Sequence, residues 1–370
     1  MAVSADSPDL RPDWPLLRQA LADVGVAAST RVWTDPDARW DDVDLVLANG
    51  AWDNIHRPEE FVAWIGRVAA VTRLANAPDV LRWNLDKRYL AALAEAGVAT
   101  VPTTWLSPGP DPRAEVEIPL PLPAGGSGGP GGPGGPGEFV VKPTVSGGGF
   151  ETARYRTGDR QAARDARLHI RRLLDAGRTV MVQPYQAVVD THGEAGLIFL
   201  GGRYSHAIGN GPMLVAGAGP QPHLYRHEQI GALAASATQR EAAQLALAAA
   251  EQLVGPTTYA RVDLVSLDDG TPAVLELELL DPALFFETHP PAATRFARML
   301  RAMIPCLRLR ALPRPRPPLR VRWPVWLPPV RVGRRVRRPC RRRRATRARR
   351  PGCPALRQSR PRPPAPRSRA

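Results

Sequence analysis

Cysteine is scarce in this chain of 370 residues, since only three occur, Cys306, Cys340 and Cys353, all near the C-terminus. They supply neither a CxxC metal-binding pair nor the paired cysteines of a disulfide-stabilised secreted domain. Long hydrophobic runs are also missing, because no stretch approaches the roughly 18 apolar residues of a membrane span. The first residues, MAVSADSPDLRPDW, lack the basic and then apolar pattern of a signal peptide. We therefore expect a cytoplasmic protein with no membrane partner.

Acidic residues and lysine are absent from the C-terminal segment between Arg308 and Ala370, which carries 23 of the 50 basic residues. The rest of the chain keeps 27 basic side chains against all 35 acidic ones, although the formal net charge of the whole is +15. The positive charge is therefore a property of the C-terminal tail. It does not indicate a nucleic-acid partner for the rest of the chain, residues 1–307, which we call the body. Like charges mixed with proline do not fold alone, so residues 307–370 are predicted to form a disordered basic tail.

Two interpretations of this tail stay open. Its Arg, Pro and Ala composition is typical of a reading-frame change in GC-rich DNA, which favours an extension without a selected role. The alternative is an arm that binds nucleic acid or anionic lipid without sequence specificity.

Lysine occurs only twice, as Lys87 and Lys142, against 48 arginines. This chain uses arginine for its generic surface cations. A position that keeps lysine therefore indicates a need for a compact ammonium on a flexible stem. Both lysines are thus candidates for functional positions, with chance survival as the alternative.

Residues 13–80 alternate short apolar runs with helical patterns, which is typical of α/β domains with a parallel sheet. The run 42–48 is predicted to be a strand. Residues 58–70 are predicted to form an amphipathic helix, whose proline and two glutamates suit a first turn. A second helix is predicted over residues 85–96, ended by a glycine.

The second region, residues 84–306, mixes strands and helices in an α+β pattern around one segment rich in proline and glycine. That segment, residues 107–137, cannot bury enough surface to order itself, so we expect a flexible insertion. The predicted extended segments and strands are 98–105, 138–143, 178–184, 197–200, 203–208, 258–264 and 273–279. The predicted helices are 161–176, 238–254 and 292–304.

Lys142 ends the apolar strand 138–143 and enters a Ser-Gly-Gly-Gly loop. An ammonium reaches phosphate oxygens, and glycines let backbone N–H groups close over a nucleotide. A glycine-rich loop alone is a weak signal. The sequence contains no GxxxxGK[ST] motif and no strand-GxGxxG-helix unit, which excludes the P-loop and dinucleotide-binding motifs.

Two neighbouring strands near the end of the body carry alternating charges. Alternate residues of a strand share a face, so Arg261 and Asp263 point one way, and Glu276 and Glu278 point together from the next strand. If the strands pair, three carboxylates and one guanidinium meet on one surface. Carboxylates at this spacing suit Mg²⁺ that also binds substrate phosphates. The alternative is a solvated sheet face of mixed charge, and we favour the metal site because the last strand is otherwise Leu and Val.

The chain resembles the ATP-grasp carboxylate ligases, which include D-alanine–D-alanine ligase, glutathione synthetase and the ribosomal-protein glutamate ligases. Among them it is most similar to the branch of the O-ureidoserine cyclo-ligase of cycloserine synthesis. The resemblance spans about residues 44–304, and its specificity comes from the order of the motifs. These are WDN…RPEEFVAWI, RWNLDKRYLAALAEAGVATVPTTW, FVVKPTVSGGG, MVQPY, GE followed by GGRYSHAI, YARVDL and LELELLDPALFF.

This resemblance implies a fold and a role for each matched position. It implies that residues 1–83 form a pre-ATP-grasp α/β domain and that residues 84–306 form a two-part ATP-grasp clamp. Lys87 and Lys142 match the two lysines that bind the nucleotide, with Lys142 over the phosphates, and Arg261 matches the arginine that steadies the acyl-phosphate and tetrahedral species. The remaining matches are the triphosphate loop Ser146, Gly147, Gly148 and Gly149, the adenine hinge Gln183, Pro184 and Tyr185, the ribose acid Asp190, and the magnesium ligands Asp263, Glu276 and Glu278.

The activity that the resemblance implies is an ATP- and Mg²⁺-dependent ligation in two steps. A substrate carboxylate attacks the γ-phosphorus of ATP, and an amine or other nucleophile then displaces phosphate from the acyl phosphate. The implied partners are ATP, two Mg²⁺ ions, a small-molecule carboxylate and a nucleophile, and a homodimer is common among similar ligases.

Two departures from related sequences leave alternatives open. Gly209-Asn210 stands where relatives usually carry a basic pair, and Ala48-Asn49-Gly50 stands where they tend to have Arg-Ser. The first removes a charge-assisted contact of roughly 1.5–3 kcal/mol if that basic residue touches the phosphates. A catalytically weakened or non-catalytic ATP-binding relative is therefore the alternative to an active ligase, and nucleic-acid binding through the tail is a further one.

Overall fold

The computed structural model describes residues 1–6, 13–109, 137–220 and 229–304. The predicted basic tail 307–370 and most of the predicted insertion 107–137 lie outside these ranges. The helices are α1 (Asp13–Asp23), the 3-10 helix η1 (Trp52–His56), α2 (Pro58–Ala69), α3 (Pro78–Asn84), α4 (Tyr89–Glu95), α5 (Arg160–Asp175), α6 (Val189–His192), α7 (Ala237–Val254) and α8 (Pro291–Met303). None of them combines the length and the apolar character needed to cross a bilayer.

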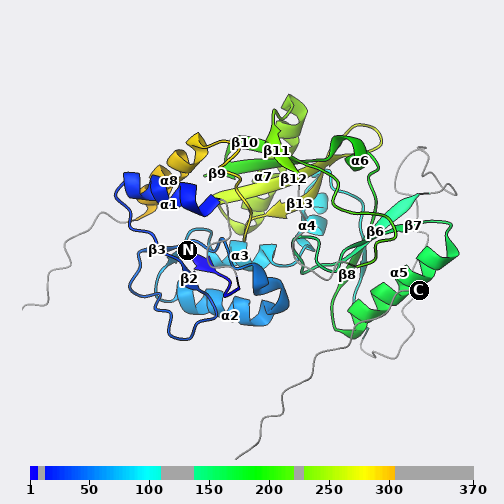
Figure 1. Cartoon of the computed structure of the whole chain (residues 1–370), viewed down its shortest axis with the longest axis horizontal. Helices are drawn as coiled ribbons and strands as arrows, with labels where there is room; N and C mark the ends of the chain where they lie inside the picture. The colour runs from blue at the N-terminus through cyan, green and yellow to red at the C-terminus, as the bar shows by residue number, and fades with distance from the viewer. Residues whose placement is uncertain (7–12, 110–136, 221–228, 305–370) are drawn as a thin grey trace, which may run out of the picture. The chain divides into compact units, whose positions relative to one another are not determined.

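The strands fall into two short parallel pairs and two larger antiparallel sheets (Figure 1). The short pairs are β1 (Ala2–Val3) with β2 (Arg31–Val32), and β3 (Leu45–Val46) with β4 (Arg73–Leu74). The larger sheets are built from β5 (Thr104–Leu106), β6 (Glu138–Pro143), β7 (Ala153–Arg156), β8 (Val180–Pro184), β9 (Glu194–Leu200), β10 (Arg203–Asn210), β11 (Ile230–Leu233), β12 (Tyr259–Ser266) and β13 (Pro272–Glu278).

The N-terminal strands form a parallel α/β layer, as the alternation of patterns predicts. The predicted helix 58–70 is confirmed as α2, which buries Phe61 and Trp64 against Trp33. The predicted strand 42–48 is too long, because only β3 pairs with the two-residue strand β4. The acidic residues at its start bind side chains instead, as in the ion pair of Asp42 with Arg31.

The predicted helix 85–96 begins too early. Residues 85–88 form a turn between α3 and α4, and α4 begins at Tyr89. The sequence patterns did not indicate α3. Local bonds compete with the helix here. The Asp86 side chain accepts the Arg88 N–H at 3.0 Å, and the Lys87 N–H donates to the Thr144 carbonyl at 2.9 Å. Lys87 therefore projects from a turn.

The four-stranded sheet has the order β5-β8-β6-β7 and is covered on one face by α5. Alternate residues of β6 separate the two faces. Phe139 and Val141 pack in the core beneath α5, whereas Val140 and Lys142 line a pocket on the other face. The two-residue period of the strand thus directs the lysine away from the core.

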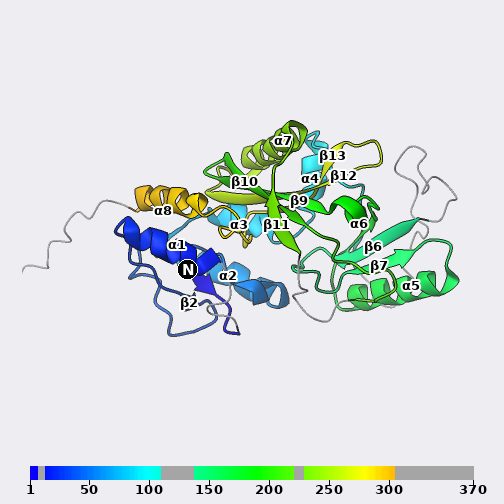
Figure 2. The ribbon, with the colours of Figure 1, turned by 45° about the horizontal axis from the view of Figure 1, so that its top comes forward.

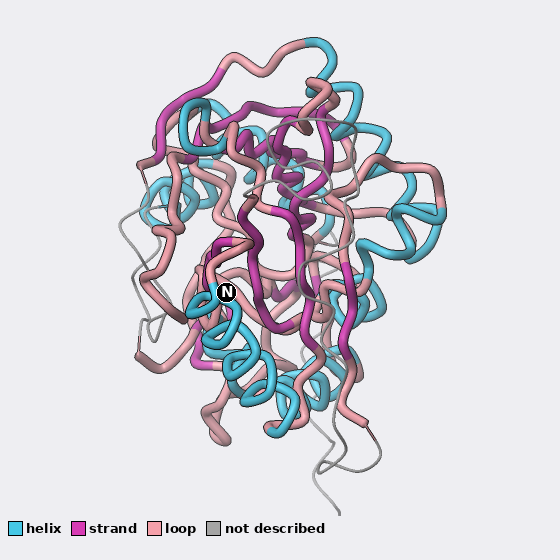
Figure 3. Tube along the Cα trace, turned by 90° about the vertical axis from the view of Figure 1, so that its right-hand side faces the viewer, coloured by secondary structure: helices cyan, strands magenta, loops and turns pink. Residues whose placement is uncertain are grey.

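The five-stranded sheet has the order β11-β10-β9-β12-β13, with every pair antiparallel. Leu197 and Phe199 of β9 pack in one hydrophobic core with α4 and α7, and Ile198 and Leu200 pack in another with α1 and α8. Figure 2 shows α7 on one side of this sheet and α1 and α8 on the other. Figure 3 draws all described strands in magenta, with the cyan helices around them.

Candidate active site

The paired strands β12 and β13 bring the predicted charged residues together. Their antiparallel register places Arg261 opposite Glu278 and Asp263 opposite Glu276, so all four share one face, as the alternation predicts. Gly196 of β9 faces Asp263, where a Cβ atom would lie 3.0 Å from its Oδ1. This glycine gives the carboxylate room.

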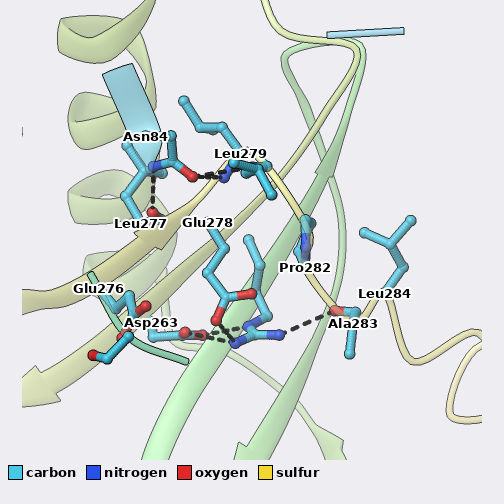
Figure 4. Close-up of polar contacts among 12 residues, drawn as sticks. Asn84, Asp263, Glu276, Leu277, Glu278, Leu279, Pro282, Ala283 and Leu284 are labelled. Atoms are coloured by element: carbon cyan, nitrogen blue, oxygen red, sulfur yellow. Dashed lines mark hydrogen bonds and ion pairs between the residues drawn. The ribbon is translucent and has the colours of Figure 1, made fainter. Parts of the chain in front are cut away.

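Arg261 lies between two of the predicted acidic residues. Its Nε and Nη2 atoms donate to Asp263 at 2.8 and 3.0 Å, and Nη2 also lies 2.5 Å from Oε1 of Glu278 (Figure 4). Burial disfavours the guanidinium charge, but the two carboxylates outweigh burial and raise the pKa of Arg261 well above its ordinary value. The group therefore stays charged while its Nη1 donates to the Ala283 carbonyl at 3.3 Å.

Lys87 connects the glycine-rich loop to the acidic strands. Its ammonium lies 3.1 Å from Oε1 of Glu276 and donates to the Ser146 carbonyl. Burial alone raises the pKa of Glu276, but the Lys87 and Lys142 ammonium groups outweigh burial and lower it. The turn that carries Lys87 thus brings a cation to strands far away in the sequence.

Lys142 is 8% exposed and points into the same site from β6. Burial lowers its pKa, with Lys87 adding to the effect and Glu276 opposing it. Both lysines of the chain therefore face one carboxylate.

A single pocket joins most of the predicted nucleotide residues. The predicted residues that line it are Lys87, Lys142, Ser146, Gly147, Gly148, Gly149, Gln183, Pro184, Tyr185 and Glu276. Asp190, Arg261, Asp263 and Glu278 are not among its lining residues. The last three adjoin Glu276 on the sheet face, as the strand register shows.

The loop Ser146–Gly149 is shaped by its last two glycines. Gly148 and Gly149 adopt φ angles of 56° and 73°, a left-handed region that glycine occupies without the cost of a Cβ atom. The Ser146 hydroxyl donates to the Pro143 carbonyl at 3.0 Å and fixes the start of the loop.

Asp190 is bound by a residue that the sequence did not indicate. Arg154 of β7 donates to both oxygens of Asp190, at 2.9 and 2.8 Å, and the Tyr185 hydroxyl donates to Oδ1 at 2.6 Å. Arg154 also pairs with Glu138, and its Cζ lies 3.5 Å from the centre of the Tyr185 ring. Arg154 carried no signal because arginine is so common in this chain.

The predicted adenine hinge also has partners within the protein. The Gln183 side chain donates to the Thr103 hydroxyl at 2.9 Å, and the Tyr185 N–H donates to the Glu138 carbonyl at 2.8 Å. These bonds fix β8 between its neighbours and orient the pocket wall.

Glu194 is a fourth carboxylate at the site and was missed. It begins β9 and lines the pocket, and burial together with nearby Asp263 raises its pKa to about 7. A signal was present, because the acid stands at the start of the apolar strand AGLIFL.

The carboxylates form a donor set that suits Mg²⁺. Asp263 and Glu276 stand opposite each other on adjacent strands, an unfavourable pairing of like charges unless a cation compensates it. Arg261 and Lys87 supply that charge here, and the described residues contain no group of three His, Cys, Asp or Glu side chains spaced to hold a metal ion. Mg²⁺ commonly takes only one or two carboxylates and completes its shell with substrate phosphates and water. The two opposed carboxylates meet that requirement.

The two departures noted in the sequence both lie beside this site. Asn210 pairs with Glu194 across β10 and β9, and its Oδ1 atom is buried with no hydrogen-bond partner among the described residues. Asn49 is buried, and its amide donates to the Pro282 carbonyl at 2.7 Å.

Comparisons with known proteins agree with the resemblance. Residues 1–76 match the family described as the N-terminal domain of D-cycloserine synthetase DcsG. The cycloserine biosynthesis protein DcsG of Streptomyces lavendulae is 39% identical over 291 residues, which are 78% of this chain and 92% of that protein. The chain belongs to the DcsG family of ATP-grasp ligases.

Solved structures support the same assignment. The crystal structure of D-cycloserine synthetase DcsG has a TM-score of 0.70 and 36% identity, covering 82% of this chain and 98% of its own. The D-alanine–D-alanine ligase of Bacillus anthracis complexed with ATP shares the fold, with a TM-score of 0.50 and 15% identity over 82% and 94% of the two chains. This DcsG family member is thus an ATP-dependent ligase with a mixed α/β ATP-grasp fold.

Proposed function

We propose that this protein joins the carboxylate of a small molecule to an amine or other nucleophile through an acyl phosphate formed from ATP. The observation that carries the proposal is the meeting of both lysines of the chain at Glu276, beside the glycine-rich loop. Positive groups gathered around a pocket stabilise charge that develops on transferred phosphate.

In the first step a carboxylate oxygen of the substrate attacks the γ-phosphorus of ATP, and the bond to the β,γ-bridging oxygen breaks to release ADP. Lys142 and Lys87 offset the negative charge of the transferred group. The loop Ser146–Gly149 closes its backbone over the phosphates, and its glycines permit the close approach.

In the second step the nucleophile attacks the acyl carbon, loses its proton and displaces inorganic phosphate. Arg261 is the charged donor assigned to the tetrahedral oxyanion. Its ion pairs with Asp263 and Glu278 orient the guanidinium beforehand, so that little reorganisation is needed during the reaction.

Asp263, Glu276 and Glu278 are the residues that would bind Mg²⁺, and two ions are expected. Mg²⁺ held there would supply positive charge that offsets the charge of the phosphates. Arg261 and Lys87 balance the charges of the opposed carboxylates of Asp263 and Glu276 in the protein itself.

The base and ribose of ATP are assigned to the other end of the pocket. Gln183, Pro184 and Tyr185 form its wall, and Asp190 is the ribose acid, oriented by Arg154.

The family membership directs the choice of substrate. The DcsG relatives are named for cycloserine synthesis, and the proposal extends this to the present chain as an intramolecular ring closure. O-ureidoserine is the first substrate to test, and intermolecular ligation of amino acids is the alternative.

A second candidate function is nucleotide binding without turnover. It is favoured by Asn210, which stands opposite Glu194. The resemblance to the family implies a basic pair at positions 209 and 210, which this chain lacks. Such a protein binds ATP with Mg²⁺ but releases no ADP with any carboxylate offered.

The proposal includes the organisation expected from the sequence. Residues 1–83 form the pre-ATP-grasp domain, residues 84–306 the clamp, and the enzyme works in the cytoplasm on small molecules, as a homodimer.

ADP release tests the proposed function. The unmodified chain, Lys142→Ala and Glu276→Ala are incubated with ATP, Mg²⁺ and either O-ureidoserine or a panel of amino acids. Turnover by the unmodified chain with loss of turnover in both folded variants supports the ligase. Retained turnover in either variant contradicts the site assignment, and ATP binding without ADP release across the panel favours the second candidate.

A further inference from the structure

The loop after β13 is fixed by a carboxylate from the other end of the chain. Asp13, the first residue of α1, is 5% exposed and accepts three successive backbone N–H groups. Its Oδ2 accepts from Leu284 at 2.7 Å and Phe285 at 3.1 Å, and its Oδ1 accepts from Phe286 at 2.6 Å. Hydrogen bonds to an ionised acceptor are about twice as strong as neutral ones. Asp13 therefore determines the path of this loop.

This path needs a fixed partner because it includes an unfavourable backbone angle. Phe285 has a φ of 49°, in the left-handed region that bulky residues rarely occupy. Such a conformation persists only where its surroundings impose it. Asp13 accepts from the N–H group of Phe285 and from those of the residues directly before and after it.

The same loop contacts Arg261 on its other side. The Ala283 carbonyl accepts from Nη1 of Arg261 at 3.3 Å (Figure 4). The Phe285 ring centre lies 5.7 Å from Cζ of Arg261. Asp263 and Glu278 bind the guanidinium of Arg261 through Nε and Nη2. The loop binds it through Nη1 and so limits its position from the other edge.

Asn49 binds the loop independently. Its amide donates to the Pro282 carbonyl at 2.7 Å, directly before the residue that contacts Arg261. Two buried polar side chains of the N-terminal region thus converge on one short loop of the ATP-grasp region.

We propose that Asp13 is a positioning residue for Arg261, acting through the loop Pro282–Phe286. The inference rests on the proposed function, which makes Arg261 the donor to the acyl intermediate. It adds that the N-terminal region sets the geometry of that donor, while the nucleotide pocket is independent of it. Asn49 supports the same loop to a smaller extent.

The test compares kinetics and structure in the full chain. Asp13→Asn keeps the size of the side chain but removes its charge and one acceptor oxygen. We expect kcat with O-ureidoserine to fall by about 10- to 100-fold while the KM for ATP changes less than about threefold, because small misplacement of a donor affects turnover most. Asn49→Ala should lower kcat by about 3- to 10-fold, again with a change of less than about threefold in the KM for ATP. Asp23→Asn, at the exposed other end of α1, is the matched control and should change neither.

A double-mutant cycle separates positioning from general destabilisation. If Asp13 acts through Arg261, then Asp13→Asn should lower kcat less than about twofold in an Arg261→Lys background. A full additional loss in that background overturns the proposal. Equal changes in kcat and in the KM for ATP would also overturn it.

A measurement without turnover keeps the inference separate from the proposed function. In a crystal structure of the Asp13→Asn chain, the proposal requires a displaced loop and loss of the bond between Arg261 and Ala283. An unchanged bond overturns it. If the unmodified chain releases no ADP, the proposed ligase function fails, and this structure alone decides the role of Asp13. Should Asp13→Asn not fold, Asn49→Ala is examined in the same way.

Discussion

The ammonium nitrogen of Lys87 lies 3.1 Å from Oε1 of Glu276, and this ion pair connects the turn after α3 to strand β13. The Lys87 side chain is 6% exposed and that of Glu276 24%, so water screens the pair only weakly. The same ammonium donates to the Ser146 carbonyl of the glycine-rich loop. One side chain therefore contacts both halves of the nucleotide pocket.

Removing the Lys87 charge should destabilise the fold and impair ATP binding separately. Lys87→Met leaves only Lys142 to offset the charge of Glu276 and should lower the free energy of unfolding by about 3 kcal/mol. The double variant Lys87→Met with Glu276→Gln should recover part of that stability, because the carboxylate that lost its ion-pair partner is removed. It should not recover ATP affinity.

Urea denaturation and calorimetry with ATP and Mg²⁺ measure these two quantities. Arg82→Met is the control, since Arg82 forms an exposed ion pair with Asp79 and should change neither. Recovery of ATP affinity in the double variant would show that Lys87 serves stability alone.

Arg154 should matter for nucleotide affinity more than for chemistry. It orients Asp190 and stacks on Tyr185, which lines the pocket beside Gln183 and Pro184. Arg154→Met should raise the KM for ATP by about tenfold or more and change kcat less than about threefold. Steady-state ADP release measures both constants.

Arg156 supplies the matched control for that experiment. It lies on the same strand, and its side chain is 68% exposed. Its Nε atom lies 3.4 Å from Oε1 of Glu138, which is a long contact for an ion pair. Arg156→Met should leave the KM for ATP unchanged, and an equal rise in both variants would argue against a specific role for Arg154.

Acidification should destabilise the protein through its buried histidines. Burial lowers the pKa of His169 from 6.5 to about 4, with Arg172 adding to the effect. The unfolded chain therefore takes up a proton below pH 6.5 while the folded chain does not, so stability falls as the pH drops from 6.5 towards 4. At pH 5 the loss from this residue is about 2 kcal/mol. His206, whose pKa burial also lowers to about 4, should add to the slope.

Urea midpoints at pH 7.5 and pH 5 measure this effect. His169→Gln should lose less stability between the two pH values than the unmodified chain, because the titrating group is gone. His192→Gln, which replaces an exposed histidine, is the control and should keep the full slope. A slope unchanged in His169→Gln would exclude His169 as its source.

A basic side chain at position 210 should strengthen nucleotide binding. Asn210 lies opposite Glu194, which lines the pocket, and a lysine there adds a charge-assisted contact of roughly 1.5–3 kcal/mol if it reaches the phosphates. Asn210→Lys should lower the Kd for ATP with Mg²⁺ by about tenfold or more in calorimetry. Gly209→Ser, a neutral change at the adjacent position, serves as control. Weaker binding by Asn210→Lys would contradict the assignment of this position to the phosphates.

The order of motifs and the two lysines were sufficient to predict the family and the fold from the sequence. Strand periodicity also predicted that Arg261, Asp263, Glu276 and Glu278 share one face, because alternation along a strand is a local property. The limits of the helices α2 and α7 were predictable within a residue or so for the same reason.

Local patterns could not predict which groups neutralise one another. Lys87 was assigned to a helix, yet a side-chain bond from Asp86 and a backbone bond to Thr144 make its segment a turn. Arg154 was indistinguishable from the many surface arginines until the sheet brought it to Asp190.

The sequence by itself determined the composition of the site, two ammonium groups, one guanidinium and a set of carboxylates on alternating strand positions. Only the tertiary structure decided how these charges pair and what fixes them in place. Asp13 reaches the loop beside Arg261 from the opposite end of the chain, and Glu194 reaches the acids from β9. Such contacts depend on how distant segments pack, and packing is a property of the whole fold that no local pattern contains.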